Sequence, residues 1–217
     1  MEFSRFSGIC GIVYFTFFSK PVRSISGIVF LIILLSFIAD CSNFFFIRLT
    51  GYNGYAIGNI WYIVNFILSV YLFALLIPNN RKLLFGLLSF FSLGTIISYA
   101  TIYSLLDSNS FVKVATSITF TFLSLKVYFD LLKSPSGLLS KNPVFWIATA
   151  YLLFSSVTLL RNLFLQFLVF ELEISKETSA TIFIIYLLAN ISKNFILFYA
   201  LVLIDKGYPD TLKRAKA

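Results

Sequence analysis

The sequence predicts an all-α membrane protein, a multi-pass bundle of seven transmembrane helices, or of six if the first apolar segment does not span. Hydrophobic residues make up 59% of the 217 residues and charged residues only 12%, whereas soluble domains usually carry about 25% charged residues. Seven apolar segments alternate with short polar ones, and most approach the roughly 20 residues needed to cross a bilayer. We therefore expect a single transmembrane helical domain over residues 1–217.

Each apolar segment ends at residues that break or terminate a helix. Proline, glycine, asparagine and charged residues follow the segments in turn, namely Lys20-Pro21, Gly51-Tyr52-Asn53-Gly54, Pro78-Asn79-Asn80-Arg81, Asp107-Ser108-Asn109, Ser134-Pro135-Ser136-Gly137 and the acidic loop from Glu171 to Glu177. Between these breaks we expect helices at residues 6–18, 25–47, 58–77, 83–106, 111–132, 144–170 and 180–204, followed by a cytoplasmic tail at 205–217.

The first segment is the weakest of the seven. Residues 6–18 are short for a full span and lie between Arg5 and the basic stretch Lys20-Pro21-Val22-Arg23. No small-residue cleavage site follows them, so we do not expect their removal as a signal peptide. If this segment does not span, the other six helices keep their orientation.

The distribution of basic residues predicts the orientation, because cytoplasmic loops collect Lys and Arg. Alternate loops and the tail place ten basic residues on one side and four on the other. The richer side contains Lys20, Arg23, Arg81, Lys82, Lys133, Lys141, Lys206, Lys213, Arg214 and Lys216, and the poorer side contains Arg5, Arg48, Lys113 and Lys176. We expect a protein of the inner (plasma) membrane with its amino end outside and its carboxyl end in the cytoplasm.

Residue usage excludes several kinds of chemistry. The chain has no histidine, which most zinc, copper and haem sites and His-based catalytic triads require. Its two cysteines, Cys10 and Cys41, lie in apolar segments without CxxC spacing. No nucleophile elbow or phosphate-binding loop is present. We expect no cofactor, no metal and no enzymatic activity, and we assign the net charge of +8 to cytoplasmic loops rather than to nucleic-acid binding.

Ionisable residues inside apolar segments mark candidate sites, because charge is costly in lipid. Lys193 lies close to the bilayer midplane in the last segment, too deep to reach either surface easily. Asn190 lies one turn before it on the same helix face, and Asn194 follows it directly. Lys193 is either a structural cation bonded between helices or part of a ligand-binding or switching site, and the two asparagines are candidates for the same site.

Asp40 and Arg161 are a second candidate pair. Asp40 lies in the outer part of the second segment and Arg161 at a similar depth in the sixth. A single acid and a single base at matching depth predict an interhelical ion pair. The alternative is that Arg161 extends outward so that its guanidinium reaches the membrane surface.

The remaining polar residues of the segments favour packing roles. Lys126 and Asp130, four residues apart near the cytoplasmic end of the fifth segment, predict a local ion pair. Hydroxyl residues form stripes on the fifth and sixth segments, and small polar residues commonly mediate helix packing in membranes. Asn65 in the third segment is a similar case, kept as a candidate ligand or switch residue. The stripes are Ser117, Thr121 and Ser124, and Ser155, Ser156 and Thr158.

Three stretches give the chain a family resemblance. They are Asn59-Ile60-Trp61-Tyr62-Ile63-Val64-Asn65-Phe66, then Asn142-Pro143-Val144-Phe145-Trp146-Ile147 with Tyr151-Leu152-Leu153-Phe154-Ser155-Ser156, and Asn190-Ile191-Ser192-Lys193-Asn194-Phe195-Ile196-Leu197-Phe198. The chain resembles a family of uncharacterised seven-helix bacterial membrane proteins, similar to the membrane input region of some sensor histidine kinases. It departs from that family at Asn65 and Thr116-Ser117, where an acidic residue is often expected.

The resemblance implies a membrane sensor or input module. We expect a non-enzymatic protein that acts in the lipid bilayer as a sensor or accessory subunit, with a separate kinase or regulator as its partner on the cytoplasmic side. The alternative is a small transporter or channel with Lys193, Asn190 and Asp40 lining the path. A lipid-modifying enzyme is the least favoured reading, since the chain has neither histidine nor paired acids. The sequence predicts no particular ligand or oligomeric state.

Overall fold

The computed structural model describes residues 24–51, 55–77, 81–101, 110–133, 138–171 and 176–206. The predicted first segment, at residues 6–18, and the tail after residue 206 lie outside these ranges. The described residues form long α-helices and one short 3-10 helix, with no strand among them. The elements are α2 (Ser24–Thr50), α3 (Tyr55–Leu76), α4 (Arg81–Thr101), α5 (Ser110–Lys133), η2 (Leu139–Lys141), α6 (Pro143–Glu171) and α7 (Lys176–Asp205).

Five of these helices are long and apolar enough to cross a membrane, and the prediction of an all-α fold is confirmed for the described residues. The qualifying stretches are Ile25–Thr50, Ala56–Leu76, Val112–Lys133, Pro143–Phe164 and Ile184–Asp205. In α4 the apolar stretch found among the described residues is shorter, Ser89–Ser98. The count of seven spanning helices therefore stays a prediction.

Local backbone chemistry explains where two helices end and begin. At the end of α2, Gly51 has a φ of +72°, a left-handed conformation that glycine adopts without steric cost. Its N–H donates to the carbonyl of Ile47 at 2.9 Å. At the start of α6, the side-chain oxygen of Asn142 accepts a hydrogen bond from the N–H of Val144 at 2.9 Å and so caps the helix. Pro143 occupies the first helical position. Its missing N–H costs no hydrogen bond there, because the first N–H groups of a helix have no intrahelical acceptor.

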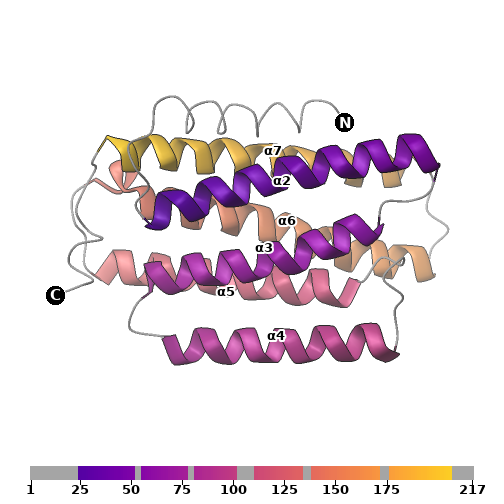
Figure 1. Cartoon of the computed structure of the whole chain (residues 1–217), viewed down its shortest axis with the longest axis horizontal. Helices are drawn as coiled ribbons and strands as arrows, with labels where there is room; N and C mark the ends of the chain where they lie inside the picture. Colours follow the sequence, from indigo (N-terminus) through magenta and orange to yellow (C-terminus); the bar gives the residue numbers. More distant parts are fainter. Residues whose placement is uncertain are drawn as a thin grey trace.

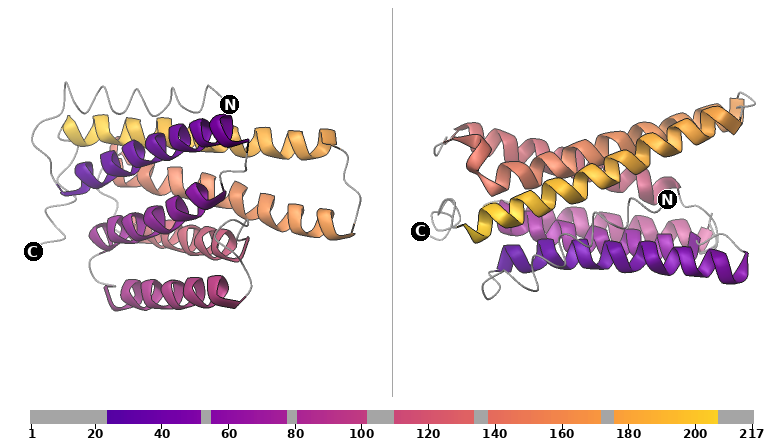
Figure 2. Two further views of the ribbon diagram at one scale, coloured as in Figure 1. Left: turned by 45° about the vertical axis from the view of Figure 1, so that its right-hand side comes forward. Right: turned by 90° about the horizontal axis from the view of Figure 1, so that it is seen from above.

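The helices are arranged in two layers (Figures 1 and 2). One layer contains α2, α3 and α4, and the other contains α5, α6 and α7, with the most extensive contacts between α5 and α6 and between α6 and α7. Successive helices run in opposite directions, so each end of the bundle gathers the same set of helix termini. We call them the Ser24 end, where α2 begins, and the Thr50 end, where α2 finishes. Toward the Thr50 end, α6 and α7 diverge from α2 (Figure 2).

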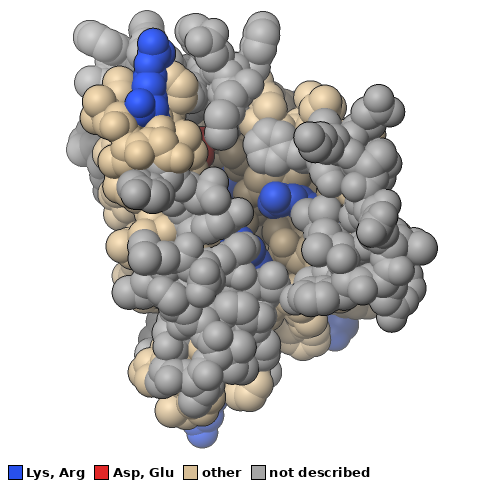
Figure 3. All heavy atoms as spheres, turned by 90° about the vertical axis from the view of Figure 1, so that its right-hand side faces the viewer, with Lys and Arg blue, Asp and Glu red and all other residues tan. Residues whose placement is uncertain are grey.

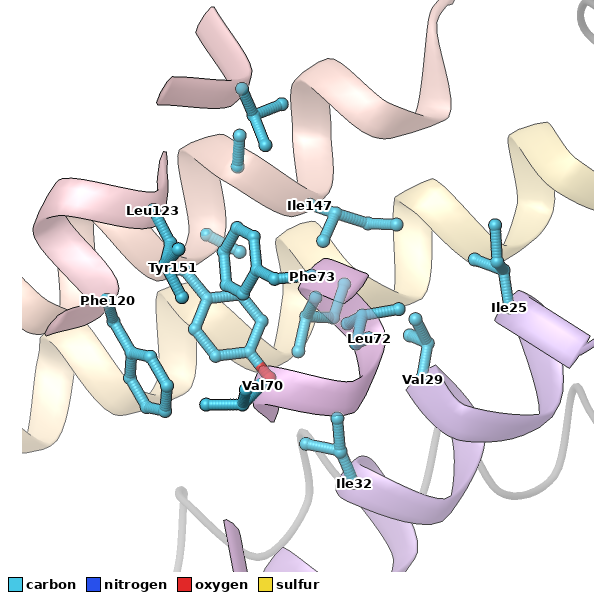
Figure 4. Packing of buried hydrophobic residues seen from close by; sticks show 14 of the residues in the cluster. Ile25, Val29, Ile32, Val70, Leu72, Phe73, Phe120, Leu123, Ile147 and Tyr151 are labelled. Carbon is cyan, nitrogen blue, oxygen red and sulfur yellow. The ribbon is translucent and has the colours of Figure 1, made fainter. Parts of the chain in front are cut away.

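The apolar core lies mainly in the half of the bundle near the Ser24 end. Figure 4 shows Tyr151 of α6 beside Phe73 of α3 and Phe120 of α5, with ring centroids 5.3 and 5.2 Å from its own. The Phe120 ring also lies 5.7 Å from that of Phe66. Other side chains that are almost completely buried occupy the same half: Val29, Ile32, Ile33, Val70, Leu72, Ile147, Ala148, Ala150, Leu197 and Ala200.

One hydroxyl network crosses this core between α3 and α6. The hydroxyls of Ser69 and Tyr151 lie 2.7 Å apart, and Ser69 also donates to the side-chain oxygen of Asn65 at 3.4 Å. All three residues are buried. The network joins the two layers through a hydrogen bond between α3 and α6.

Replacing Tyr151 with Phe tests the contribution of this network. The change removes the hydroxyl and keeps the ring, so we expect the free energy of unfolding to fall by about 1 kcal/mol. Unfolding in mixed detergent micelles, followed by circular dichroism, measures the difference. Tyr71→Phe is the matched control, because Tyr71 is 54% exposed on the same α3 helix that carries Ser69. An equal loss in both variants would contradict a specific role for the Ser69–Tyr151 bond.

Candidate functional site

Charged and aromatic side chains from every described α-helix except α4 meet in the half of the bundle near the Thr50 end. Their contacts form one continuous set, which we call the cation–tyrosine cluster. Its members are Asp40 of α2, Tyr62 of α3, Lys113 of α5, Phe154 and Arg161 of α6, and Tyr186 and Lys193 of α7.

A pair of tyrosines forms the centre of the cluster. The hydroxyl oxygens of Tyr62 and Tyr186 lie 3.2 Å apart and share a hydrogen bond between α3 and α7. Each ring also faces a cation. The guanidinium carbon of Arg161 lies 4.3 Å from the Tyr186 ring centroid, and the Lys113 Nζ lies 5.6 Å from that of Tyr62. Such cation–π contacts are favourable, more so away from water, so the rings hold both cations near the hydroxyl pair.

Lys193 lies deeper in the bundle than these groups. It is only 4% exposed, and its Nζ lies 4.4 Å from the ring centroid of Phe154. The Phe154 ring in turn lies 5.7 Å from that of Tyr186. Tyr186 and Lys193 are about two helical turns apart on α7, which corresponds to roughly 10 Å of depth. The cluster therefore has an upper level at the tyrosine pair and a lower level at Lys193.

Asp40 supplies the negative charge of the cluster. Its carboxylate lies near enough to act electrostatically on Lys193 and on the hydroxyls of Tyr62 and Tyr186. The Arg161 charge acts on the same two hydroxyls. Asp40 and Arg161 thus occupy one neighbourhood, while their direct ion pair stays a prediction.

Several buried polar atoms around the cluster have no hydrogen-bond partner among the described residues. On α2 these are the Oγ of Ser36 and the Oδ1 of Asn43, which lie on the same helix face as Asp40. On α5 and α6 they include the Oγ1 of Thr116 and the Nδ2 of Asn162. Leaving a buried polar group unsatisfied costs about 1–3 kcal/mol. This half of the bundle is therefore suited to hold water or a polar ligand.

The upper level of the cluster lies nearer the Thr50 end of the bundle than the lower level does. Lys113 lies in the first turn of α5, whereas Arg161 and Tyr186 lie about ten residues from the Thr50 ends of α6 and α7. Figure 3 shows the molecule from that end, with basic side-chain atoms visible in the hollow at the centre of the face.

The structure places the other predicted site residues around this cluster or apart from it. Asn190 and Asn194 lie on α7, one turn before Lys193 and directly after it, with Asn194 only 2% exposed. Asn65 belongs to the hydroxyl network of the core through Ser69.

The packing roles predicted for other polar residues are confirmed where contacts are present. Lys126 and Asp130 form an ion pair at 2.6 Å. The hydroxyls of Thr121 and Ser155 lie 2.9 Å apart between α5 and α6, as expected of residues that join helices. Ser117 and Thr158 instead donate to carbonyl oxygens of their own helices, at 2.8 and 2.7 Å.

Sequence reasoning missed four members of the site: Lys113, Tyr62, Tyr186 and Phe154. Lys113 lay within the predicted helix at 111–132 but was counted only among the basic residues of the outer side; in α5 its Nζ lies over the ring of Tyr62. Tyr62 and Tyr186 were not singled out among the 12 tyrosines of the chain. The available signal was their position, since each lies in the half of an apolar helix that is nearer the Thr50 end.

The side chains of the cluster are suited to binding a charged or polar group. Among the described residues no group of three His, Cys, Asp or Glu side chains could hold a metal ion. The cluster offers cations, hydroxyls and one carboxylate, which together can hold an anionic or strongly polar group. The chain matches no family model, and neither a curated protein nor a solved structure shows significant similarity to it.

Proposed function

We propose that the protein is a non-enzymatic membrane receptor, a sensor or accessory subunit that binds a ligand at the cation–tyrosine cluster. The observation that carries this proposal is the cluster itself. Five helices contribute its side chains, so a ligand that contacts them all changes how the two layers fit together. Polar groups of this kind are costly inside a membrane bundle and are kept where they bind something.

We also propose how the bundle is oriented in the membrane of a bacterial cell. The Thr50 end faces the outside and the Ser24 end faces the cytoplasm of a bacterial cell, because basic residues gather at the Ser24 end. Residues 6–18 and α4 complete a set of seven spanning helices. The described basic residues near the Ser24 end are Arg81, Lys82, Lys126, Lys133, Lys141 and Lys206.

A ligand bound in the outer half changes the arrangement of the helices at the cytoplasmic face, where a partner binds. The resemblance to the input region of sensor kinases favours a kinase or regulator as the partner there. The hydroxyl bridges between α5 and α6, including one from Tyr128 to Thr149 at 2.6 Å, make those two helices a unit that transmits movement along its length.

A transporter or channel is the alternative function. It needs a polar route through the whole bilayer, past Lys193, Asn190 and Asp40 and onward to the Ser24 end. Beyond the cluster, such a route meets fully buried apolar side chains, among them Val29 and Leu197. The receptor is therefore the better supported function.

Thiol labelling separates these two functions. In a chain without Cys10 and Cys41, Asn43→Cys places a thiol beside Asp40, and Val29→Cys places one on nearly the same face of α2 in the apolar half. We expect a membrane-impermeant maleimide added outside to modify the first thiol and to leave the second untouched from either side.

The outcomes have clear meanings. Modification of Val29→Cys from both sides would show a continuous aqueous route and favour the transporter. Modification of Asn43→Cys only from the cytoplasmic side would overturn the orientation. Failure to modify Asn43→Cys from either side would contradict an accessible ligand site in this half of the bundle. Circular dichroism of each variant verifies that the helices are retained.

A further inference from the structure

Four uncharged side chains near the cation–tyrosine cluster each bury a polar atom that lacks a hydrogen-bond partner. Ser36 of α2, Thr116 of α5 and Asn162 of α6 are only 4%, 3% and 7% exposed. Among the described residues no partner is present for their Oγ, Oγ1 and Nδ2 atoms, or for the buried Oδ1 of Asn43 on α2. Burying such atoms without a partner is costly, so a bound molecule that pairs with them is favoured.

The four groups lie in one part of the bundle and come from both of its layers. On α2, Ser36 lies four residues before Asp40 and Asn43 three residues after it, so all three share a helix face. Ser36 and Asn43 are thus separated by roughly 10 Å of depth. On the other layer, Thr116 and Asn162 lie within one helical turn of the cations that α5 and α6 contribute to the cluster.

The hydroxyl of Thr116 does not use the partner that its own helix offers. Ser and Thr within a helix can donate to a carbonyl of the preceding turn. Ser117 and Thr119 do so on α5, each at 2.8 Å. Thr116, the residue just before Ser117, makes no such bond within the described part of the chain. Its hydroxyl can therefore both donate to a ligand and accept from one.

The charged side chains of the cluster already have contacts within it, whereas its uncharged groups do not. Each of the three cations lies over an aromatic ring, and Asp40 acts electrostatically on Lys193. The uncharged groups are of mixed type, because Asn162 offers a donor, Asn43 an acceptor, and the hydroxyls offer both. In the tyrosine pair only one hydroxyl hydrogen is used between the two oxygens, so the other can donate to a ligand.

We propose that the ligand of the receptor is an uncharged, hydroxyl-rich molecule, a polyol or small sugar, bound between α2, α5 and α6 beside the tyrosine pair. Each hydroxyl of such a molecule both donates and accepts, and the aromatic rings of the cluster pack on its carbon atoms. A carboxylate only accepts and leaves the Oδ1 of Asn43 without a donor. An ammonium group only donates and leaves the Nδ2 of Asn162 without an acceptor. This inference rests on the proposed receptor function and specifies its ligand class.

A ligand of this kind joins the two layers where they separate. Asn43 belongs to α2 and Asn162 to α6, and α6 and α7 diverge from α2 toward the Thr50 end (Figure 2). A molecule that bonds to both asparagines draws these helices together. Water occupies the same positions while the site is empty, and the hydroxyls of the ligand take over its hydrogen bonds.

Thermal unfolding of the full chain in phosphatidylcholine nanodiscs tests the ligand class. The probes are myo-inositol, sorbitol, glucose and sucrose, at millimolar concentrations too low for general co-solvent stabilisation. Glucuronate and glucamine are the charged counterparts of glucose and sorbitol, with a carboxylate and an ammonium group. We expect an uncharged probe to raise the unfolding midpoint by about 5 °C and the charged counterparts to raise it much less.

Two threonine substitutions on α5 then separate a ligand contact from a structural role. Thr116→Val removes a hydroxyl without a partner, so it should raise the midpoint of the ligand-free protein by about 2 °C. The same change should reduce the shift caused by the probe by half or more. Thr121→Val is the matched control, because the hydroxyl of Thr121 bonds to that of Ser155 at 2.9 Å. It should lower the midpoint by about 2 °C and leave the probe's shift unchanged.

Each outcome bears on the proposal. A shift with an uncharged probe that falls in Thr116→Val supports it. No shift with any of the uncharged probes, a larger shift with a charged counterpart, or an equal shift in Thr116→Val would overturn it. A lower midpoint of ligand-free Thr116→Val would contradict the site, since the hydroxyl would then already have a partner. The labelling of Asn43→Cys needs no polyol, so the receptor function and its ligand class can fail separately.

Discussion

Replacing Asp40 with Asn should destabilise the bundle by about 3 kcal/mol, because it removes the carboxylate whose charge acts on the buried Lys193. Asp40 is the single acidic residue of the cation–tyrosine cluster, and its charge acts on Lys193, which is 4% exposed. The free energy of unfolding is measured in mixed micelles without phosphate or anionic lipid, so that no bound anion replaces the lost carboxylate.

A second substitution identifies the partner of Asp40. If Lys193 is that partner, adding Lys193→Met to Asp40→Asn should restore most of the lost stability, since it removes the uncompensated cation. A better rescue by Arg161→Met would instead show that the Asp40–Arg161 ion pair predicted from the sequence forms. Asp130→Asn is the control, because the side chain of Asp130 is 41% exposed in its pair with Lys126, and such pairs contribute less than about 1 kcal/mol.

Replacing Phe120 with Ala should lower the free energy of unfolding by about 2 kcal/mol. In soluble proteins a buried Phe→Ala change costs about 3–5 kcal/mol, of which part is transfer of apolar surface to water. In a bilayer that part is absent, because the unfolded helix is surrounded by lipid, and only the lost packing remains. Phe120 contacts Phe66, Phe73 and Tyr151 through its ring, so the packing loss is large.

Phe122 provides the matched comparison on the same helix. It lies two residues after Phe120 and is 53% exposed on the outside of the bundle. Phe122→Ala should change the free energy of unfolding by less than about 0.5 kcal/mol, because lipid replaces the missing ring. Equal losses in the two variants would contradict the assignment of Phe120 to the core.

The helices were predictable from the sequence because long apolar segments alternate with short stretches of helix-breaking residues. The ends of the helices were harder to predict. The predicted helices at 25–47 and 180–204 stop at the limits of the apolar segments, whereas α2 continues to Thr50 and α7 begins at Lys176. Backbone hydrogen bonds continue through polar residues once a helix has formed, and Gly51 is what stops α2. Hydropathy alone does not show where the helical hydrogen bonding ends.

The layering of the bundle could not be predicted in the same way. In a soluble protein apolar residues mark the inward face of a helix, but in lipid both faces are apolar. Phe120 and Phe122 are identical in type, and only the structure shows that one is buried and the other faces outward. The contacts between α2 and α7, which are distant in sequence, follow from this layering and not from any pattern.

The charged members of the site were identified for a different reason. Asp40, Arg161 and Lys193 stand out because each is an ionisable residue in an apolar segment. Tyr62 and Tyr186 do not stand out, since tyrosine is common in this chain and is ordinary near membrane surfaces. Their pairing depends on how α3 and α7 approach each other, which the sequence does not encode in any local signal.

The separation of the bundle into a polar half and an apolar half also determines how the electric field of an energised membrane falls across the protein. If the Thr50 end faces the outside, as proposed above, the potential in the polar half is close to that of the outside solution, and most of the drop occurs across the apolar half around Val29, Phe73 and Leu197. A charge that crosses the whole drop gains about 2.3 kcal/mol per 100 mV, but an uncharged ligand in the polar half gains nothing from it. Ligand occupancy at the cluster should therefore be the same in energised and de-energised cells.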